Sequence, residues 1–424
     1  MLDIKFVREN KEKVKENCVN RNVKCDVDEL LELDEKKREL ITRADELKAE
    51  KNRLNEELKK GGDKKKIIEK GKKVKDELEK IEPKLEKISN EFRDLIIKVP
   101  NMSHPDAPIG KDDTQNKEVE IYGEIPKFDF QPKNHEELMR DLDLIDFERG
   151  AKVSGSKFYY LKNEGALLEI GLINYAFHKL ISKGFVPFTT PDLARDKVLE
   201  GIGFNPRGEE TQVYSVENTD LNLVGTAEIT MGGYHMDEVI QEEDLPLKYV
   251  AFSHCFRTEA GAYGKHSSGL YRVHQFSKVE MFAYTLPEKS AEMHKELKDI
   301  EVEIFLDLGL PFRVVDICTG DLGGPAYRKY DLEAWMTSKN GWGEVTSTSD
   351  TTAYQARRLN IKVQRRDGTR EYLHMLNGTA VAVSRALIAI IENYQQKDGS
   401  VIVPEVLRPF MPAPIEVIRK RVDK

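Results

Sequence analysis

The chain has 424 residues, enough for two or three domains, and one third of its residues are charged. Its net charge of −8 is uneven: residues 1–100 hold 28 basic and 25 acidic side chains (+3), which leaves 39 and 50 (−11) for the rest. No apolar run approaches the ~20 residues that span a bilayer, and the amino terminus lacks a signal-peptide pattern. We therefore expect a soluble, cytoplasmic protein without membrane contact, whose N-terminal part meets a polyanion.

Apolar side chains recur every seven residues in two segments near the amino terminus, as in a coiled coil. They are Leu33, Leu40, Leu47 and Leu54 in the first segment, and Ile67, Val74, Leu78, Ile81, Leu85, Ile88, Phe92 and Leu95 in the second. Gly61 and Gly62 separate the segments and permit a tight reversal. The pattern predicts two antiparallel helices forming an arm of roughly 45 Å, with a bend near Pro83.

The tip of this predicted arm is strongly basic. Nine lysines lie between residues 59 and 75, among them Lys59, Lys60, Lys64, Lys65 and Lys66. A charge run is usually a solvated face, and a coiled coil can serve equally as a dimerisation element or a spacer. A protruding cationic tip without aromatic side chains also suits the phosphate backbone of a duplex-like nucleic acid. The residues alone leave these alternatives open.

Beyond the arm, a Pro- and Asp-rich segment without periodicity begins near residue 100 and reads as a linker. Three regions are predicted: a helical arm (1–100), a linker with the start of the second domain (101–160), and a core (161–424). Within the core, helices are expected over 165–184, 290–309 and 377–396, with short strands in hairpins between them. Pro187 and Pro191 restrict the strand 185–193 to a sheet edge. This pattern indicates an α+β fold with an antiparallel sheet.

Residues 251–282, AFSHCFRTEAGAYGKHSSGLYRVHQFSKVEMF, read as a hairpin with a long Gly/Ser-rich loop. The two-residue period of a strand places Arg257 and Glu259 on one face of its first strand. On the returning strand, the residues that alternate in the same way are Arg272, His274, Phe276, Lys278 and Glu280. Such side chains make a poor core, so we interpret the hairpin as a binding site.

No GxxxxGK[ST] loop and no GxGxxG after a strand is present, so a bound nucleotide would have to be held by arginines on a sheet. Arg385 lies in the apolar run VAVSRALIAII, where a charge is costly unless it meets a carboxylate or a ligand phosphate. The residues alone favour a structural salt bridge for Arg385.

Taken together, these segments resemble seryl-tRNA synthetases of the bacterial and organellar type over essentially the whole chain. The helix 165–184 with FVPFTTP resembles motif 1 of class II synthetases, FRTE with its loop and returning strand resembles motif 2, and NGTAVAVSR resembles motif 3. VGTAEIT, TGDLG with YDLEAWM, and ENYQQKDGSVIVPEVLRPFM are typical of the seryl branch, as is the arm. The combination in this order is highly specific.

The resemblance implies a serine–tRNA ligase that activates serine with ATP to seryl-adenylate and then charges tRNA(Ser), and also tRNA(Sec). It further implies a class II catalytic domain, a homodimer built through motif 1, and an arm that binds tRNA through its lysines. The residues 265, 266 and 272 of the motif 2 loop would contact the acceptor end of the tRNA. No zinc is expected, because nothing here matches the cysteine-held site of the methanogen-type variant.

For ATP, the resemblance implies a site in which Arg257, Arg385 and Glu344 are the catalytic residues. The ATP-binding set is Arg257, Thr258, Glu259, Val273, Phe276, Glu344, Val345, Thr346, Ser347 and Arg385. Arg257 would clamp the α-phosphate, Glu259 and Val273 would contact adenine, and Phe276 would stack on it. Glu344 and Ser347 would supply oxygen ligands to a Mg²⁺ bound with ATP.

For serine, the resemblance implies a pocket that selects the substrate hydroxyl through buried polar groups. Its members are Thr226, Ala227, Glu228, Arg257, Glu280, Asn377 and Thr379. From the residues alone, Thr226 would be an ordinary buried hydroxyl bonded to the backbone. Two other functions stay open: a paralogue that charges a carrier protein or metabolite, which the complete arm disfavours, and a coiled-coil protein with an inert domain.

Overall fold

The computed structural model describes residues 1–204, 212–259 and 269–421, which form two compact units, Met1–Met102 and Ser103–Lys424. Each unit has its own hydrophobic core. Within the described residues, no helix combines the length and apolarity that crossing a membrane requires.

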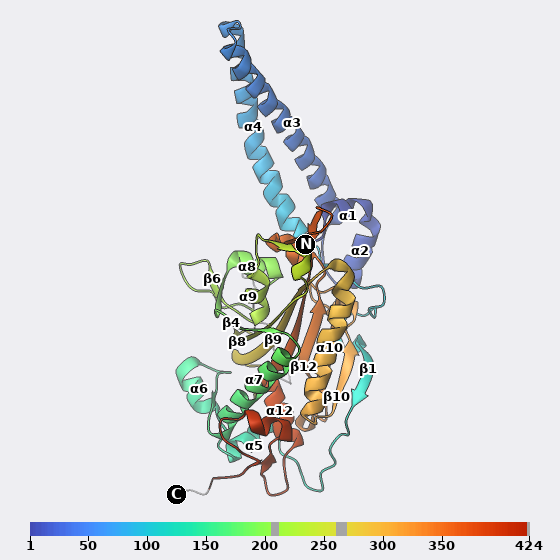
Figure 1. The fold of residues 1–424 in the computed structure, drawn as a ribbon, viewed down its shortest axis with the longest axis vertical. Helices are drawn as coiled ribbons and strands as arrows, with labels where there is room; N and C mark the ends of the chain where they lie inside the picture. Colours follow the sequence, from blue (N-terminus) through green and yellow to red (C-terminus); the bar gives the residue numbers. More distant parts are fainter. Residues whose placement is uncertain (205–211, 260–268, 422–424) are drawn as a thin grey trace. The chain divides into compact units, whose positions relative to one another are not determined.

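The first unit is entirely helical. Its helices are α1 (Ile4–Glu9), α2 (Lys11–Asn20), α3 (Val27–Lys59) and α4 (Lys64–Ile96). The long helices α3 and α4 pack against each other, and their ribbons lie closest near the reversal and separate toward the opposite end (Figure 1). The apolar residues that recur in the sequence are buried between them, from Leu47 and Leu54 on α3 to Ile67 and Leu78 on α4. The predicted antiparallel coiled-coil arm is confirmed.

The reversal between α3 and α4 follows the expected glycine chemistry. Gly61 has a φ of +85°, which is unfavourable for any residue with a Cβ, and Gly62 donates to the carbonyl of Glu57 at 3.2 Å. Asp63 caps α4 by accepting from the backbone N–H of Lys66. The helix α4 continues unbroken through Pro83, and the bend expected there stays a prediction.

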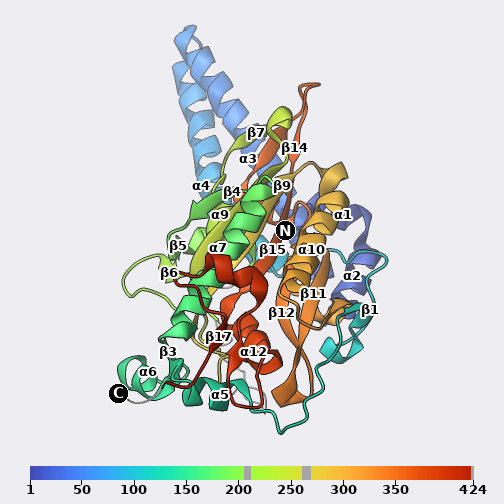
Figure 2. The ribbon, with the colours of Figure 1, turned by 60° about the horizontal axis from the view of Figure 1, so that its bottom comes forward.

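The second unit is built on an eight-stranded sheet with the order β1-β10-β11-β12-β15-β9-β8-β4 (Figure 2). The strands are β1 (Lys117–Tyr122), β4 (Val186–Thr189), β8 (Leu247–Phe256), β9 (Gln275–Thr285), β10 (Phe312–Asp316), β11 (Arg328–Met336), β12 (Gly341–Asp350) and β15 (His374–Ala382). All neighbours pair antiparallel except β4 and β8. The expected α+β fold with an antiparallel sheet is therefore present. Pro187 lies on the edge strand β4, as its missing N–H requires.

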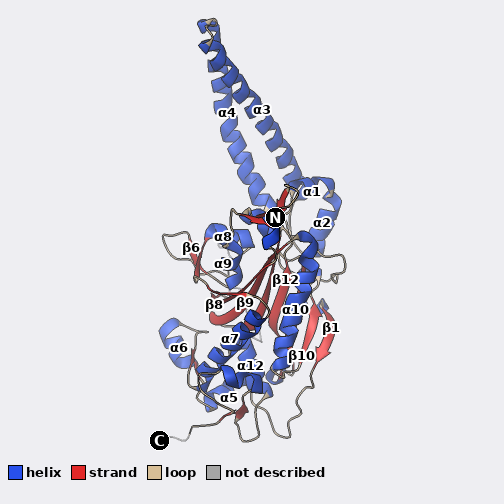
Figure 3. Cartoon of the chain, viewed as in Figure 1, coloured by secondary structure: helices blue, strands red, loops and turns tan. Residues whose placement is uncertain are grey.

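Three long helices cover one face of this sheet, and Figure 3 shows them in front of the strands: α7 (Glu164–Ser182), α10 (Ser290–Asp307) and α12 (Val383–Asn393). Val279 and Met281 of β9 pack against them in the main core, whereas Phe282 and Tyr284 belong to a second core on the opposite face. The second core includes α8 (Asp196–Ile202), α9 (Ala227–Gly233), α11 (Tyr354–Leu359) and the small sheet of β7 (Val239–Gln241), β13 (Lys362–Gln364) and β14 (Arg370–Tyr372).

The remaining α-helices and strands are short. They are α5 (His135–Asp141), α6 (Phe147–Ser154), β2 (Ile145–Asp146), β3 (Tyr160–Leu161), β5 (Leu193–Arg195), β6 (Leu221–Leu223), β16 (Val401–Ile402) and β17 (Val417–Ile418). The helix α5 contacts α12, and β5 pairs with β6 beside α8.

One predicted element is wrong in its first half. Residues 377–382 were expected to begin a helix, but they belong to the central strand β15, and α12 starts only at Val383. Both faces of the strand are buried, so its sequence lacks the alternation of buried apolar and exposed polar residues that marks a half-buried strand. The run NGTAVA carries no periodicity that would distinguish a strand from a helix.

Candidate active site

The hairpin of β8 and β9 supplies the centre of the site. Lys278 and Glu280 of β9 alternate with the core residues Val279 and Met281, so they lie on the face opposite to the covering helices. The first strand ends at Phe256, one residue before Arg257, and the returning strand begins at Gln275 rather than at Tyr271. Arg257 and Glu259 therefore lie beyond the paired strand, and the predicted strand alternation does not apply to them.

A cavity of about 360 Å³ opens on this face and brings together most of the residues expected to bind serine. Its polar lining includes Thr226, Glu228, Arg257, Lys278, Glu280, Lys329, Glu344, Ser347, Asn377 and Thr379. Ala227 is fully buried in the second core, so its side chain contributes packing. These lining residues come from five separate stretches of sequence: 226–228, the hairpin 257–280, 329, 344–347 and 377–379.

Glu228 lies in the first turn of α9, where Thr226 caps the helix by accepting from the backbone N–H of Glu228 at 3.2 Å. This is the ordinary backbone role that the sequence alone suggested for Thr226. Glu228 Oε1 accepts from Gln355 Nε2 at 2.8 Å and from Asn377 Nδ2 at 2.9 Å. Burial, and to a smaller extent the carboxylate of Glu280, raises the pKa of Glu228 to about 7.

Lys278, Glu280 and Thr379 form a second buried group in the cavity. Lys278 Nζ lies 2.5 Å from Glu280 Oε2, and the hydroxyl of Thr379 is 3.3 Å from that oxygen and 3.4 Å from Lys278 Nζ. Sequence reasoning assigned no role to Lys278, although its position on the same strand face as Phe276 and Glu280 was a usable signal. Gln355 was missed as well, because its helix carries no motif.

A smaller cavity of about 50 Å³ continues from the first one and is lined by most of the residues expected to bind ATP. They include Arg257, Glu259, Val273, Phe276, Glu344, Val345, Thr346 and Arg385. Arg257, Lys278, Glu344 and Thr379 line both cavities. Arg257 donates from Nε to the carbonyl of Gly225 at 3.3 Å, and its guanidinium lies 5.3 Å from the ring centroid of Phe276. A cation is thus fixed at the junction of the two cavities.

Glu344 and Arg385 form an ion pair at this junction, with Glu344 Oε1 and Arg385 Nη1 3.1 Å apart. Burial would raise the pKa of Glu344, but the charges of Arg385, Lys329 and Arg257 outweigh it and hold that pKa at about 2. The salt bridge that the sequence alone suggested for Arg385 is therefore present.

Glu344 and Ser347 are three residues apart on β12, a spacing that puts side chains on opposite faces of a regular strand. The pairing with β11 is irregular here, because Thr346 pairs with Leu332 while Glu344 pairs with Glu333. This β-bulge at Val345 returns Glu344 and Ser347 to the same cavity. No three His, Cys, Asp or Glu side chains converge as a metal site in the described part of the chain.

The beginning of the hairpin loop has its own geometry. Thr258 donates its backbone N–H to the carbonyl of Gln212, and Glu259 adopts a φ of +52° that is rare for residues other than glycine. Its carboxylate lies 3.3 Å from Arg272 Nη1. The expected tRNA contacts at Lys265 and His266 fall outside the described residues.

Comparisons with known proteins agree with this arrangement. Residues 1–103 match the family described as "Seryl-tRNA synthetase N-terminal domain", and residues 212–394 match "tRNA synthetase class II core domain (G, H, P, S and T)". The serine–tRNA ligase of Treponema denticola is 55% identical over 415 residues, which cover 97% of this chain and 98% of the relative. That of Dictyoglomus thermophilum is 56% identical over 416 residues, with the same coverage.

A solved structure is similar over its full length. The crystal structure of seryl-tRNA synthetase from Pyrococcus horikoshii complexed with ATP has a TM-score of 0.91 and 39% sequence identity, and the match covers 100% of both chains. The long arm and the antiparallel sheet are thus shared with this solved structure. The chain belongs to the seryl-tRNA synthetase family, with a class II synthetase core.

Proposed function

We propose that the protein is a serine–tRNA ligase, which activates L-serine with ATP to seryl-adenylate and pyrophosphate and then transfers serine to the 3′ end of tRNA(Ser). The observation that carries the proposal is the continuity of the two cavities through Arg257, Lys278, Glu344 and Thr379. One cavity is lined by acids and amides suited to a small amino acid, and the other by arginines and an aromatic ring suited to a nucleotide. A reaction between two substrates requires such a junction.

In the first step, the serine carboxylate attacks the α-phosphate of ATP and pyrophosphate leaves. Arg257 lies where both cavities meet, so its guanidinium would contact the carboxylate and the α-phosphate together and offset their repulsion. Phe276 would stack on adenine, with Glu259 and Val273 lining the same cavity and Thr258 adjoining Glu259 in the sequence. Arg385 would bind the terminal phosphate, exchanging its pairing with Glu344 for a ligand contact.

Glu344 and Ser347 fit a Mg²⁺ that is shared with the phosphates. Glu344 stays ionised because of its low pKa, and the bulge at Val345 directs it and Ser347 into one cavity. Mg²⁺ commonly takes one or two protein oxygens and completes its shell with phosphates and water, so this small set suffices. When bound, the ion would neutralise phosphate charge.

Selection of serine rests on buried polar groups that are already close to one another. Glu280, Thr379 and Asn377 present oxygens and an amide to a ligand of limited size, and Glu228 adds a carboxylate for the substrate ammonium. Alanine would fit into the same pocket but leave one of these groups unpaired, which can reduce reactivity by ~10⁴-fold or more.

We assign tRNA binding to the arm (1–100) and catalysis to residues 161–424, joined by the segment 101–160. The lysines at the tip of the arm are exposed, including Lys59, Lys60, Lys64, Lys65 and Lys66. The same arm would serve tRNA(Sec), if that tRNA shares the shape and acceptor end of tRNA(Ser). A homodimer is supported by large apolar side chains exposed on α7 and β4: Ile170 is 42% exposed, Ile181 48% and Val186 51%.

Serine-dependent ATP–pyrophosphate exchange, measured over a panel of amino acids, tests the first step, and charging of tRNA(Ser) tests the second. We expect exchange with serine alone and charging of tRNA(Ser). Exchange without tRNA charging, combined with transfer to a carrier protein or metabolite, would favour the paralogue instead. Sedimentation of the protein and of Ile170→Glu with Ile181→Glu tests the dimer, which should dissociate in the variant.

A further inference from the structure

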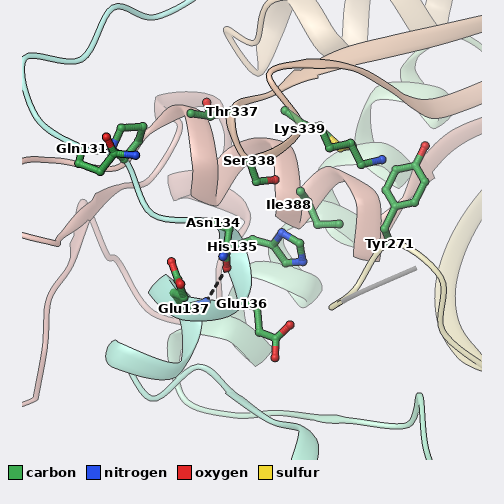
Figure 4. A pocket seen from close by; sticks show the side chains of 12 residues that line it. Gln131, Asn134, His135, Glu136, Glu137, Tyr271, Thr337, Ser338, Lys339 and Ile388 are labelled. Atoms are coloured by element: carbon green, nitrogen blue, oxygen red, sulfur yellow. Dashed lines mark hydrogen bonds between the residues drawn. The ribbon is translucent and has the colours of Figure 1, made fainter. Parts of the chain in front are cut away.

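We refer to the cavity of about 50 Å³ proposed for ATP as the nucleotide cavity. A larger cavity of about 680 Å³ adjoins it and shares Tyr271 with it (Figure 4). It is bounded by the segment that begins α5, by the turn between β11 and β12, and by α12 through Ile388. The turn carries Thr337, Ser338 and Lys339. None of these residues has a role in the reaction described above.

Lys339 points toward the ring of Tyr271 in Figure 4, with its Nζ 3.1 Å from the ring centroid. The guanidinium of Arg385 lies 4.8 Å from the same centroid. Both cations therefore form cation–π contacts with the ring of Tyr271. This ring lies at the end of the nucleotide cavity where Arg385 would bind the terminal phosphate. Burial, and to a smaller extent the charge of Arg385, lowers the pKa of Lys339 to about 8. A bound anion would stabilise the protonated form of Lys339.

The positions of Lys339 and Tyr271 trace to one buried carboxylate. Glu392 of α12 is fully buried, and its Oε2 accepts from the backbone N–H of Ser338 at 2.9 Å, one residue before Lys339. Its Oε1 accepts from the backbone N–H of His135 at 3.0 Å and lies 2.7 Å from His135 Nδ1. Burial would raise the pKa of Glu392, but these hydrogen bonds outweigh it and lower that pKa.

The ring of His135 completes the connection. His135 Nε2 accepts from the backbone N–H of Leu270 at 3.2 Å, one residue before Tyr271. Because Nε2 accepts, the ring proton of the neutral imidazole is on Nδ1, where it is donated to Glu392. The carboxylate thus fixes the tautomer that the contact with Leu270 requires. The buried His135–Glu392 pair thus accepts hydrogen bonds from the backbone N–H groups of Ser338 and Leu270. Ser338 directly precedes Lys339 in the chain, and Leu270 directly precedes Tyr271.

We propose that Lys339 is a further phosphate-binding residue at the triphosphate end of the ATP site, and that His135 and Glu392 are the positioning pair that places it and Tyr271. The proposal rests on the proposed function, because it assumes ATP as the substrate. A purely structural pair would also join α5 to α12, so stability alone does not separate the two roles. A comparison of two ligands separates these roles, because the triphosphate of ATP would reach Lys339 whereas AMP ends at the α-phosphate.

The test is the binding of ATP and of AMP to the full-length protein by calorimetry, together with serine-dependent pyrophosphate exchange. Lys339→Met keeps the length and removes the charge, and Lys339→Arg keeps the charge. We expect Lys339→Met to weaken ATP binding about tenfold, as for a lost charge-assisted contact, to raise the KM for ATP and to leave AMP binding within about twofold. Lys339→Arg should retain most of the ATP affinity.

Glu392→Gln probes the positioning pair with almost no change in shape. The amide can still accept from Ser338, but its NH₂ group opposes His135 Nδ1–H and favours the other tautomer, which cannot accept from Leu270. We expect the same pattern as for Lys339→Met: weaker ATP binding, unchanged AMP binding and an unchanged KM for serine. His135→Gln, which cannot bridge the same two groups, should behave alike.

His235→Asn is the control, because His235 also pairs with a glutamate, Glu238, at 2.7 Å and lies 2.9 Å from the hydroxyl of Tyr249, but its ring packs against Tyr249 and Tyr284 of the second core. It should lower the thermal midpoint without separating ATP from AMP binding. Equal losses of ATP and AMP affinity in Glu392→Gln would overturn the positioning role. Unchanged ATP affinity in Lys339→Met would overturn the phosphate contact. Absence of serine-dependent exchange in the unmodified protein would instead refute the proposed function.

Discussion

Lys278 and Glu280 form an ion pair on one face of β9, with Lys278 Nζ 2.5 Å from Glu280 Oε2 and both side chains almost fully buried. A pair of this kind loses the hydration of both charges, so each charge depends on the other. Lys278 lines both cavities, and Glu280 lines the cavity of about 360 Å³ proposed for serine. A substitution in this pair should therefore change both the stability of the protein and its binding of serine.

Lys278→Met should therefore destabilise the protein by about 3–5 kcal/mol, the cost of leaving a buried charge without its partner, and raise the KM for serine at least tenfold. Denaturant unfolding and pyrophosphate exchange measure the two effects. Adding Glu280→Gln to Lys278→Met should recover part of the stability, since no buried charge remains, but not the affinity for serine. A single variant as stable as the unmodified protein would contradict this prediction.

Glu228 should make stability depend on pH in an unusual direction. Its pKa is raised to about 7, above the usual value of 4.5 for an unfolded chain, so the folded state holds the proton more tightly. Its contribution to the free energy of unfolding is fully present below about pH 4.5 and is lost as the pH rises to about 7. The amide of Glu228→Gln does not titrate, so the free energy of unfolding of this variant should not fall for this reason over the same pH range.

Thermal midpoints of both proteins between pH 4.5 and 8 check this. The unmodified protein should lose stability relative to Glu228→Gln as the pH rises, and the difference should level off above pH 7. Glu228→Gln should also raise the KM for serine, because an amide cannot neutralise the substrate ammonium. A constant difference in midpoint across this range would show that Glu228 titrates normally.

Glu344→Gln should reduce pyrophosphate exchange by about 10²-fold or more, since an amide neither pairs with Arg385 as a charge nor binds Mg²⁺ well. The Mg²⁺ concentration that gives half-maximal exchange should rise. Asp331→Asn is the comparison variant. Burial raises the pKa of Asp331 to about 7, so this carboxyl group is a poorer metal ligand than Glu344, and the substitution should change the Mg²⁺ requirement less. An unchanged Mg²⁺ requirement in Glu344→Gln would remove Glu344 from the proposed metal site.

Reversing the charges at the tip of the arm should separate the two half-reactions. In Lys64→Glu, Lys65→Glu and Lys66→Glu combined, tRNA charging should fall at least tenfold and exchange should be unchanged, because phosphate contacts contribute only to RNA binding. The KM for tRNA should also lose part of its dependence on salt. The same substitutions at the exposed Lys117, Lys127 and Lys152 of the second unit provide the control. Equal loss of exchange in the tip variant would refute the division of labour.

The sequence predicted the elements whose signal is periodic or chemically unusual. The heptads of the arm, the glycine reversal and the β8–β9 hairpin were all found, because the apolar spacing and the turn residues specify them locally. The strand β15 was mistaken for helix, since a central strand that is buried on both faces has no period to detect.

The site was less accessible than the fold to sequence reasoning. Glu344 and Ser347 were paired by resemblance, but only the irregular register opposite Leu332 and Glu333 explains how they reach one cavity. Likewise Glu392 and His135 lie 257 residues apart, and no local pattern connects them. Contacts of this range depend on the completed sheet, which single-sequence patterns do not describe.

The strand order has a consequence for the protein as it leaves the ribosome. β15 lies between β12 and β9, yet it is the last of the eight strands to be synthesised. Until residue 382 has emerged, the nascent chain holds two half-sheets with open edges, which are prone to pair wrongly. Arg257 and Glu280 belong to one half, Glu344 to the other, and Thr379 and Arg385 arrive with the joining strand and its helix. We therefore expect an interrupted translation product to have no partial activity, because the site is complete only when β15 joins the two half-sheets.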